Sequence, residues 1–105
     1  MNKKIIKIVN ELNIELKKLF ADFEGLYIYG SQINGIPNKD SDIDIVAILD
    51  ASDKEKRYEM WGKVSFLEYQ YNINIDLNPS TRQELERNYI YHNEVVNKGI
   101  FYAAF

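Results

Sequence analysis

Two aspartates lie one residue apart in an otherwise apolar segment, DIDIVAIL, residues 42–49. In a β-strand, residues i and i+2 project from the same face, so the carboxylates of Asp42 and Asp44 would lie side by side. A carboxylate in an apolar setting is costly unless a cation or another partner neutralises it. Carboxylate oxygens suit Mg²⁺ or Mn²⁺, which also bind substrate phosphates. The pair therefore indicates either a divalent-metal site or a solvent-exposed strand face.

A third aspartate, Asp76, lies near the end of an alternating segment, NINIDL, residues 72–77. If this strand lies beside the first, three carboxylates converge. Two like charges about 5 Å apart repel by roughly 3 kcal/mol at an effective dielectric of 20, so such a cluster needs a cation or a raised pKa. The alternative is a turn that starts at Asp76, because Asn78 and Pro79 follow.

Gly30 ends a short apolar and aromatic segment, residues 26–30, and Ser31 follows it. Glycine allows the backbone to approach a ligand closely. Ser31 offers a hydroxyl and a backbone N–H to a phosphate, and a helix that begins there would add its dipole. A plain turn is the structural alternative. Phosphates on one side and metal-binding carboxylates on the other would suit phosphoryl or nucleotidyl transfer.

Together these residues follow a known pattern. Gly30-Ser31, ten further residues and then Asp42-Ile43-Asp44 match the G-S-x10-D-x-D signature. The sequence thus resembles the DNA polymerase β-like nucleotidyltransferase superfamily. Its short length makes it most similar to the minimal nucleotidyltransferases, the MNT antitoxins that are paired with HEPN toxins. The resemblance covers the organisation of almost the whole chain.

The resemblance implies a role for each of these residues. Gly30 and Ser31 would bind the nucleoside triphosphate, and Asp42 and Asp44 would ligate both metals. Asp76 would ligate the catalytic metal and help to deprotonate the attacking hydroxyl. The substrate would be ATP, and AMP would pass to a tyrosine of a HEPN toxin. This AMPylation would make the protein an antitoxin in a complex with its partner.

The segments that would position these residues alternate between helix and strand. Apolar residues at three- and four-residue steps predict a helix over residues 2–21. Further helices are expected over 51–70 and 82–97, and strands over 26–30, 42–49 and 72–77, with Pro79 ending the last strand. The order α-β-β-α-β-α predicts an α/β (α+β) fold with a small mixed sheet of three or four strands flanked by helices. Six residues of the second long helix are expected to be available for its core face: Tyr58, Trp61, Val64, Phe66, Leu67 and Tyr71.

Composition excludes several other classes of protein. The 105 residues suit one domain, 1–105. A net charge of −3 without a long basic run argues against direct nucleic-acid binding. The absence of cysteine removes disulfides and thiolate zinc sites and fits a reducing compartment. No run approaches the roughly 20 apolar residues of a membrane span, so we expect a cytoplasmic protein.

Two other functions compete with protein AMPylation. A chain of this length has little room for an acceptor domain, so the acceptor is expected to arrive with a partner. The same fold could also be an inactive module that neutralises its partner by contact alone. A third reading is a nucleotidyltransferase for a small molecule of the aminoglycoside type. Intact carboxylates favour the enzyme, because an inactive copy has no reason to keep a repulsive cluster. His92, the single histidine, is expected to be structural.

Overall fold

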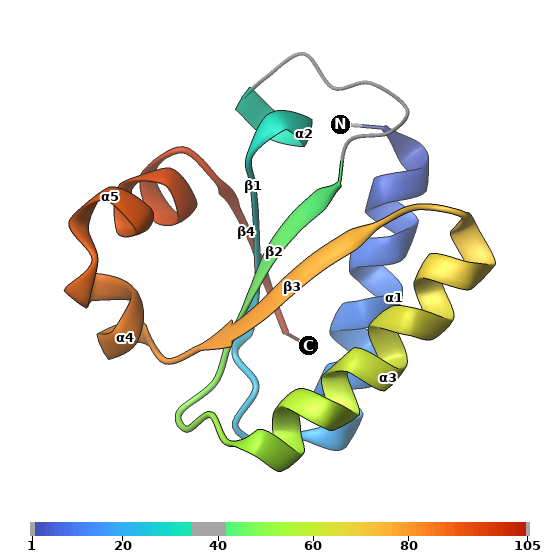
Figure 1. Cartoon of the computed structure of the whole chain (residues 1–105), viewed down its shortest axis with the longest axis horizontal. Coiled ribbons are helices and arrows are strands. Elements are labelled where there is room, and N and C mark those ends of the chain that lie inside the picture. The colour runs from blue at the N-terminus through green and yellow to red at the C-terminus, as the bar shows by residue number, and fades with distance from the viewer. Residues whose placement is uncertain (1, 35–41, 105) are drawn as a thin grey trace.

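The computed structural model describes residues 2–34 and 42–104. Figure 1 shows a twisted sheet between two groups of helices. In chain order the elements are α1 (Lys3–Leu19), β1 (Gly25–Tyr29), α2 (Ser31–Asn34), β2 (Ile43–Ile48), α3 (Lys54–Tyr71), β3 (Ile75–Ser80), α4 (Arg82–Arg87), α5 (Tyr89–His92), the π-helical turn η1 (Asn93–Asn97) and β4 (Ile100–Ala103). The predicted loop over residues 35–41 lies outside the described residues.

The sheet has four strands in the order β3-β2-β1-β4. β1 runs antiparallel to both β2 and β4, whereas β2 and β3 are parallel. This arrangement confirms the predicted mixed sheet flanked by helices. The fourth strand is β4, formed by the apolar segment near the C-terminus.

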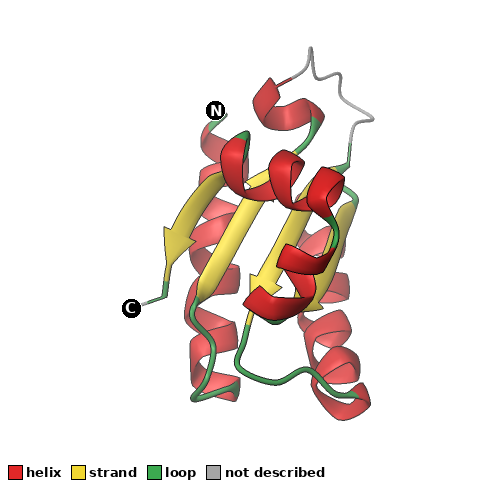
Figure 2. Ribbon diagram, turned by 90° about the vertical axis from the view of Figure 1, so that its left-hand side faces the viewer, coloured by secondary structure: helices red, strands yellow, loops and turns green. Residues whose placement is uncertain are grey.

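Helices cover both faces of the sheet, α1 and α3 on one side and α4, α5 and η1 on the other (Figure 2). The residues of β2 alternate between the two layers. Ile43, Ile45 and Ala47 belong to the core beneath α1 and α3. Val46 and Ile48 pack on the opposite face with residues that include Leu85 of α4 and Val95 of η1. β2 is therefore apolar on both sides, and Asp44 is an exception within it.

The two long helices begin at the caps that their sequences supply. The Asn2 side chain accepts hydrogen bonds from the N–H groups of Lys4 and Ile5, and the Asp53 side chain accepts one from Lys56. One face of α1 is buried through Ile5, Ile8, Val9, Leu12 and Leu16, as its periodicity predicts. Within the described ranges, no helix combines the length and the apolar character that a membrane crossing requires.

The core face of α3 differs from the prediction. Tyr58, Trp61 and Phe66 are 57%, 48% and 65% exposed, whereas Met60, Val64 and Leu67 are buried. The helix carries apolar side chains on several sides, so its periodicity does not single out the core face. The exposed aromatic residues of α3 are thus free to contact something other than this domain's core.

The prediction that Pro79 ends the third strand is wrong, because β3 continues to Ser80. β3 is an edge strand, and the carbonyls of Asn74 and Ser80 accept hydrogen bonds from the N–H groups of Ile43, at the start of β2, and Leu49, just after its end. The odd-numbered residues therefore direct their N–H groups to the open edge, where the Glu68 side chain accepts the Ile75 N–H. Pro79 occupies one of these outward positions, so its missing N–H costs no sheet hydrogen bond.

The single helix predicted over 82–97 is divided into three pieces. Thr81 caps α4 by accepting the Glu84 N–H, as its capping-box sequence predicts. Asn88 then interrupts the helix, and its side chain accepts the Tyr91 N–H at the start of α5. The chain ends this region in the π-helical turn η1. The interruption lets the helical segment turn back over the sheet and bury Val95.

Candidate active site

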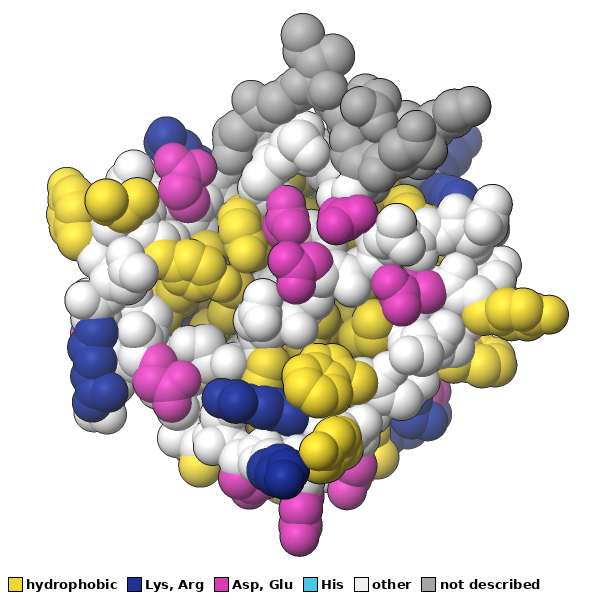
Figure 3. All heavy atoms as spheres, in the orientation of Figure 1, with side chains coloured by type: hydrophobic (Ala, Val, Ile, Leu, Met, Phe, Trp, Pro, Cys, Tyr) yellow, Lys and Arg dark blue, Asp and Glu magenta, His cyan; other side chains and the backbone are white. Residues whose placement is uncertain are grey.

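The register of the sheet places two of the predicted site residues next to each other. Asp44 of β2 and Asp76 of β3 are direct partners across the parallel pair, so their side chains share one face of the sheet. This is the face that α4 and α5 partly cover. Figure 3 shows acidic side chains gathered over the first halves of β2 and β3. The condition stated from the sequence, that the two strands lie side by side, is met, and Asp76 lies within β3 rather than in a turn.

The carboxylates influence one another electrostatically. Burial raises the pKa of Asp44, and the negative charges of Asp76 and Asp42 raise it further. Asp44 is only partly exposed, whereas Asp42, one residue before β2, is exposed. Ionised Asp44 is therefore held in an unfavourable environment that a cation would improve.

Gly30, at the end of β1, has a role in the fold that the sequence does not reveal. Its φ of +80° lies in the region that favours glycine. A Cβ atom at this position would overlap the carboxylate of Asp44. Tyr29, the residue before it, is the direct partner of Asp44 in the antiparallel pair of β1 and β2. Gly30 therefore makes room for the Asp44 side chain, in addition to any ligand that it allows to approach.

Ser31 is the first residue of α2 and is partly exposed. The short helix is closed by a hydrogen bond from the Ile33 N–H to the Gly30 carbonyl, at 3.0 Å. Ser31 thus directly follows the glycine that lies beside the Asp44 carboxylate. The structure brings Gly30, Asp44 and Asp76 together. Ser31 directly follows Gly30 in the chain, and Asp42 lies two residues before Asp44.

The donor atoms suit a hard divalent cation, because every candidate ligand is a carboxylate oxygen. The Asp76 Oδ1 atom accepts a hydrogen bond of 3.3 Å from the Asn78 Nδ2 group. Among residues 2–34 and 42–104, no group of three acidic, histidine or cysteine side chains forms a ready-made metal site. Like charges separate unless a cation holds them together. The fold thus supplies the adjacent pair Asp44 and Asp76, and Asp42 must turn toward them to complete the predicted set of three.

Tyr29, which lies beside Asp44, and its partner Tyr91 were not predicted from the sequence. The hydroxyls of Tyr29 and Tyr91 lie 3.3 Å apart and their rings meet edge to face at 5.8 Å. Burial raises the pKa of Tyr29 well above its ordinary value, with further contributions from Tyr91, Asp44 and Asp76. Its hydroxyl therefore stays protonated at neutral pH. The position of Tyr29 directly before Gly30 could have identified it from the sequence. Tyr91 reaches Tyr29 only because the helix is interrupted before α5.

Comparison with known families identifies the class of protein. The family described as "Polymerase beta, Nucleotidyltransferase" matches residues 3–98. Because this match covers most of the chain, the chain belongs to that family and is a nucleotidyltransferase. The resemblance inferred from Gly30-Ser31 and Asp42-Ile43-Asp44 is confirmed at this level. A comparison with curated proteins finds no significant match.

Several solved structures share the fold. A chain in a crystal structure of a toxin–antitoxin with AMP-PNP is 24% identical, with a TM-score of 0.59, and the match covers 93% of this chain and 68% of that one. A crystal structure from Shewanella oneidensis is 23% identical over 99% of this chain and 74% of that one, with a TM-score of 0.59. A third match is to a chain in the structure of the tri-AMPylated Shewanella oneidensis HEPN toxin in complex with MNT antitoxin. It is 22% identical, covers 93% of this chain and 65% of that one, and has a TM-score of 0.53. At these identities the matches describe the fold.

Proposed function

We propose that this nucleotidyltransferase transfers AMP from ATP to a tyrosine hydroxyl of a HEPN-family toxin and thereby acts as an antitoxin. The observation that carries the proposal is the pairing of Asp44 with Asp76 beside Gly30. The similarity to a toxin–antitoxin structure with AMP-PNP and to an AMPylated HEPN toxin in complex with MNT antitoxin supports the choice of nucleotide and acceptor.

The carboxylates would suit Mg²⁺ as the cofactor, with Mn²⁺ as the alternative. Asp42 and Asp44 would hold it, and Asp76 would complete the oxygen ligands. When bound, Mg²⁺ would supply positive charge that balances the phosphates and the growing charge on the leaving group. The raised pKa of Asp44 supports this assignment, because a bound cation would favour the ionised carboxylate.

Each residue of the site has a proposed task in the transfer. The Ser31 hydroxyl and N–H would hold the triphosphate, while Gly30 leaves space for the Asp44 carboxylate. Asp76 would accept the proton of the attacking hydroxyl. The hydroxyl oxygen then bonds to the α-phosphorus, the bond from that phosphorus to the bridging oxygen breaks, and pyrophosphate leaves with the bonding electrons.

Intact-mass spectrometry provides the test. The protein would be mixed with ATP, Mg²⁺ and the HEPN-family protein encoded by a neighbouring gene. We expect the partner to gain one or more AMP units, and to gain none with Asp44→Asn or with EDTA. Asp50→Asn is the matched control, because Asp50 is exposed in the loop after β2.

The outcomes separate the competing functions. A partner that is bound and silenced without gaining mass would replace the enzyme by an inactive binding module. A small acceptor of the aminoglycoside type that gains AMP, while the protein partner does not, would make the chain a small-molecule nucleotidyltransferase. Full activity of Asp44→Asn would overturn the assignment of the site itself.

A further inference from the structure

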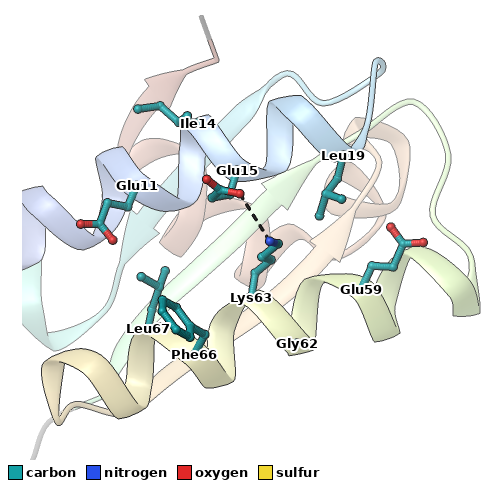
Figure 4. Close-up of a pocket in the computed structure, with 9 residues that line it drawn as sticks. All are labelled: Glu11, Ile14, Glu15, Leu19, Glu59, Gly62, Lys63, Phe66 and Leu67. Atoms are coloured by element: carbon teal, nitrogen blue, oxygen red, sulfur yellow. Dashed lines mark ion pairs between the residues drawn. The ribbon is translucent and has the colours of Figure 1, made fainter.

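A groove lies between the antiparallel helices α1 and α3 (Figure 4). These helices cover the face of the sheet opposite the one that carries Asp44 and Asp76. The volume of the groove is about 610 Å³. Apolar side chains from both helices remain exposed along it, since Ile14, Leu19 and Phe66 are 45%, 39% and 65% exposed. The groove therefore offers apolar surface that the described part of the chain does not cover.

Gly62 lies in the middle of α3 and lines this groove. Glycine weakens the interior of a helix, so its presence calls for a reason. The backbone does not demand it, because Gly62 is not among the positive-φ glycines. Packing does not demand it either, because a Cβ atom there would meet no neighbouring atom. What glycine achieves at this position is a gap in the groove wall, through which another backbone can approach closely.

The groove is also acidic. Its lining contains the three carboxylates of Glu11, Glu15 and Glu59 and only one cation, Lys63. Lys63 forms an ion pair of 3.4 Å with Glu15, to which Lys18 also lies close, at 3.7 Å. Glu11 accepts a hydrogen bond of 2.6 Å from the neutral Tyr71 hydroxyl.

Two of the three carboxylates in the lining lie at the two ends of the groove. Figure 4 places Glu11 toward the Leu67 end and Glu59 toward the Leu19 end. Among the described residues, neither of these carboxylates forms an ion pair within 4.0 Å. An occupant with basic side chains at both ends would therefore match the groove.

We propose that this groove docks a basic amphipathic helix of the partner protein that carries the acceptor hydroxyl. A helix is the natural occupant, because the ridge of one helix packs into the groove between two others and Gly62 permits a close approach. A second copy of the chain docked groove to groove fits poorly, because the three glutamates of one lining would face those of the other. The identity of the partner rests on the proposed function.

Docking at this place would separate binding from chemistry. The partner would be held against α1 and α3 while its acceptor segment reaches Asp44 and Asp76 on the other face. Loss of the catalytic carboxylate should then leave docking unchanged. Obstruction of the groove should weaken docking without altering the carboxylates.

The experiment fills the groove by substitution at the position where glycine leaves it open. Gly62→Gln places a side chain in the groove, and Ser65→Gln, at an exposed α3 position outside the groove lining, is the matched control. The probe is a fluorescein-labelled amphipathic Leu/Lys peptide of about 18 residues, long enough to form a helix, together with a Leu/Glu peptide of the same pattern. Fluorescence anisotropy measures the affinity of each peptide for the protein. We expect Gly62→Gln to bind the basic peptide at least about tenfold more weakly, as steric exclusion from an interface centre predicts.

Ser65→Gln and Asp44→Asn should bind like the unmodified protein, and the acidic peptide should bind to none of them. Equal binding by Gly62→Gln, or no binding of the basic peptide to the unmodified protein, would overturn the proposal. Self-association that Gly62→Gln abolishes in analytical ultracentrifugation would make a second copy the occupant.

The peptide assay uses no ATP and no transfer, so its failure is distinct from a failure of the proposed function. Peptide binding without any AMP transfer would support the docking groove and contradict the proposed enzyme activity. Undiminished AMP transfer by Gly62→Gln would support the proposed enzyme activity and contradict the docking of the acceptor protein in the groove.

Discussion

A glycine lies on each side of the sheet, Gly30 directly after β1 and Gly62 in α3, and the surroundings of the two are opposite. Gly30 has a positive φ, and the Asp44 carboxylate occupies the space where its side chain would lie. Gly62 has an ordinary helical backbone and empty space beside it. The fold therefore explains Gly30 completely. It does not explain Gly62, whose reason must be sought outside the chain.

The two faces also differ in how their acidic groups are arranged. On the proposed catalytic face, which carries Asp44 and Asp76, the two residues are direct partners in the sheet, and the charge of Asp76 adds to the burial that raises the pKa of Asp44. On the opposite face, Glu11 and Glu59 lie at separate ends of an open groove. Adjacent carboxylates call for a small cation, whereas separated ones call for an extended basic partner.

Asp44→Asn should have the largest effect of any substitution on the catalytic face. We expect AMP transfer to fall by about a thousandfold or more, as when a central catalytic group is removed. The measurement is AMP incorporation by intact mass, with Asp50→Asn as the control that keeps its rate. If Asp44→Asn retained even a tenth of the activity, the contrast between a catalytic face and a docking face would fail.

Gly30→Ala should have the second largest effect. The added methyl group would displace the Asp44 carboxylate, and a misplacement of about 1 Å can cost a hundredfold in rate. The strained backbone should also lower the free energy of unfolding by roughly 1–3 kcal/mol. Transfer assays and urea denaturation would measure the two losses separately. Normal activity in a normally stable Gly30→Ala protein would show that the Asp44 carboxylate does not need this position.

The sequence predicts the catalytic face better than the rest of the molecule. Gly30-Ser31 and Asp42-Ile43-Asp44 are local patterns, and alternation correctly places Asp44 on the face opposite Ile43 and Ile45. The pairing of Asp44 with Asp76 depended on which strand lies beside β2, which no local pattern contains. The sequence therefore supports this pairing only as a condition, and the observed strand order meets that condition.

The misjudged positions share a physical cause. Phe66 lies on α3, where apolar side chains occur on several sides, so periodicity could not distinguish the core face from the exposed surface. Pro79 was expected to end β3, but at an open sheet edge its missing N–H costs nothing. Tyr91 reaches Tyr29 only because Asn88 interrupts the helix. In each case the surroundings, rather than the local sequence, decide the outcome.

Gly62→Ala should have a smaller effect on the free energy of unfolding than Gly30→Ala, and the effect should have the opposite sign. Alanine should raise the free energy of unfolding by about 0.5–1 kcal/mol, because it favours the helix and meets no neighbour. Urea denaturation measures the change, with Ser65→Ala as a control for a simple gain in helix propensity. A decrease in stability would show that the fold itself requires Gly62, which would remove the main argument for the docking groove.

The smallest expected effect is the gain in stability of Asp44→Asn without metal. The pKa of Asp44 is raised in the folded protein, so the folded state binds more protons than the unfolded state in the pH range between the two pKa values. Stability from this group therefore falls as pH rises through that range, and above it the full penalty remains. Asn cannot ionise, so the variant should be more stable than the unmodified protein at pH 7, by a few degrees in Tm at most because Asp44 is partly exposed to water.

The difference should shrink as the pH is lowered toward about 4, the ordinary range of an aspartate. Mg²⁺ should also reduce it, because only the unmodified protein can use the cation to offset the repulsion between Asp44 and Asp76. Thermal denaturation across pH, with EDTA or Mg²⁺, measures both dependences. A variant that is less stable at pH 7 would show that favourable bonds hold the Asp44 carboxylate. The catalytic face would then resemble the opposite face, where the fold tolerates its acidic groups without strain.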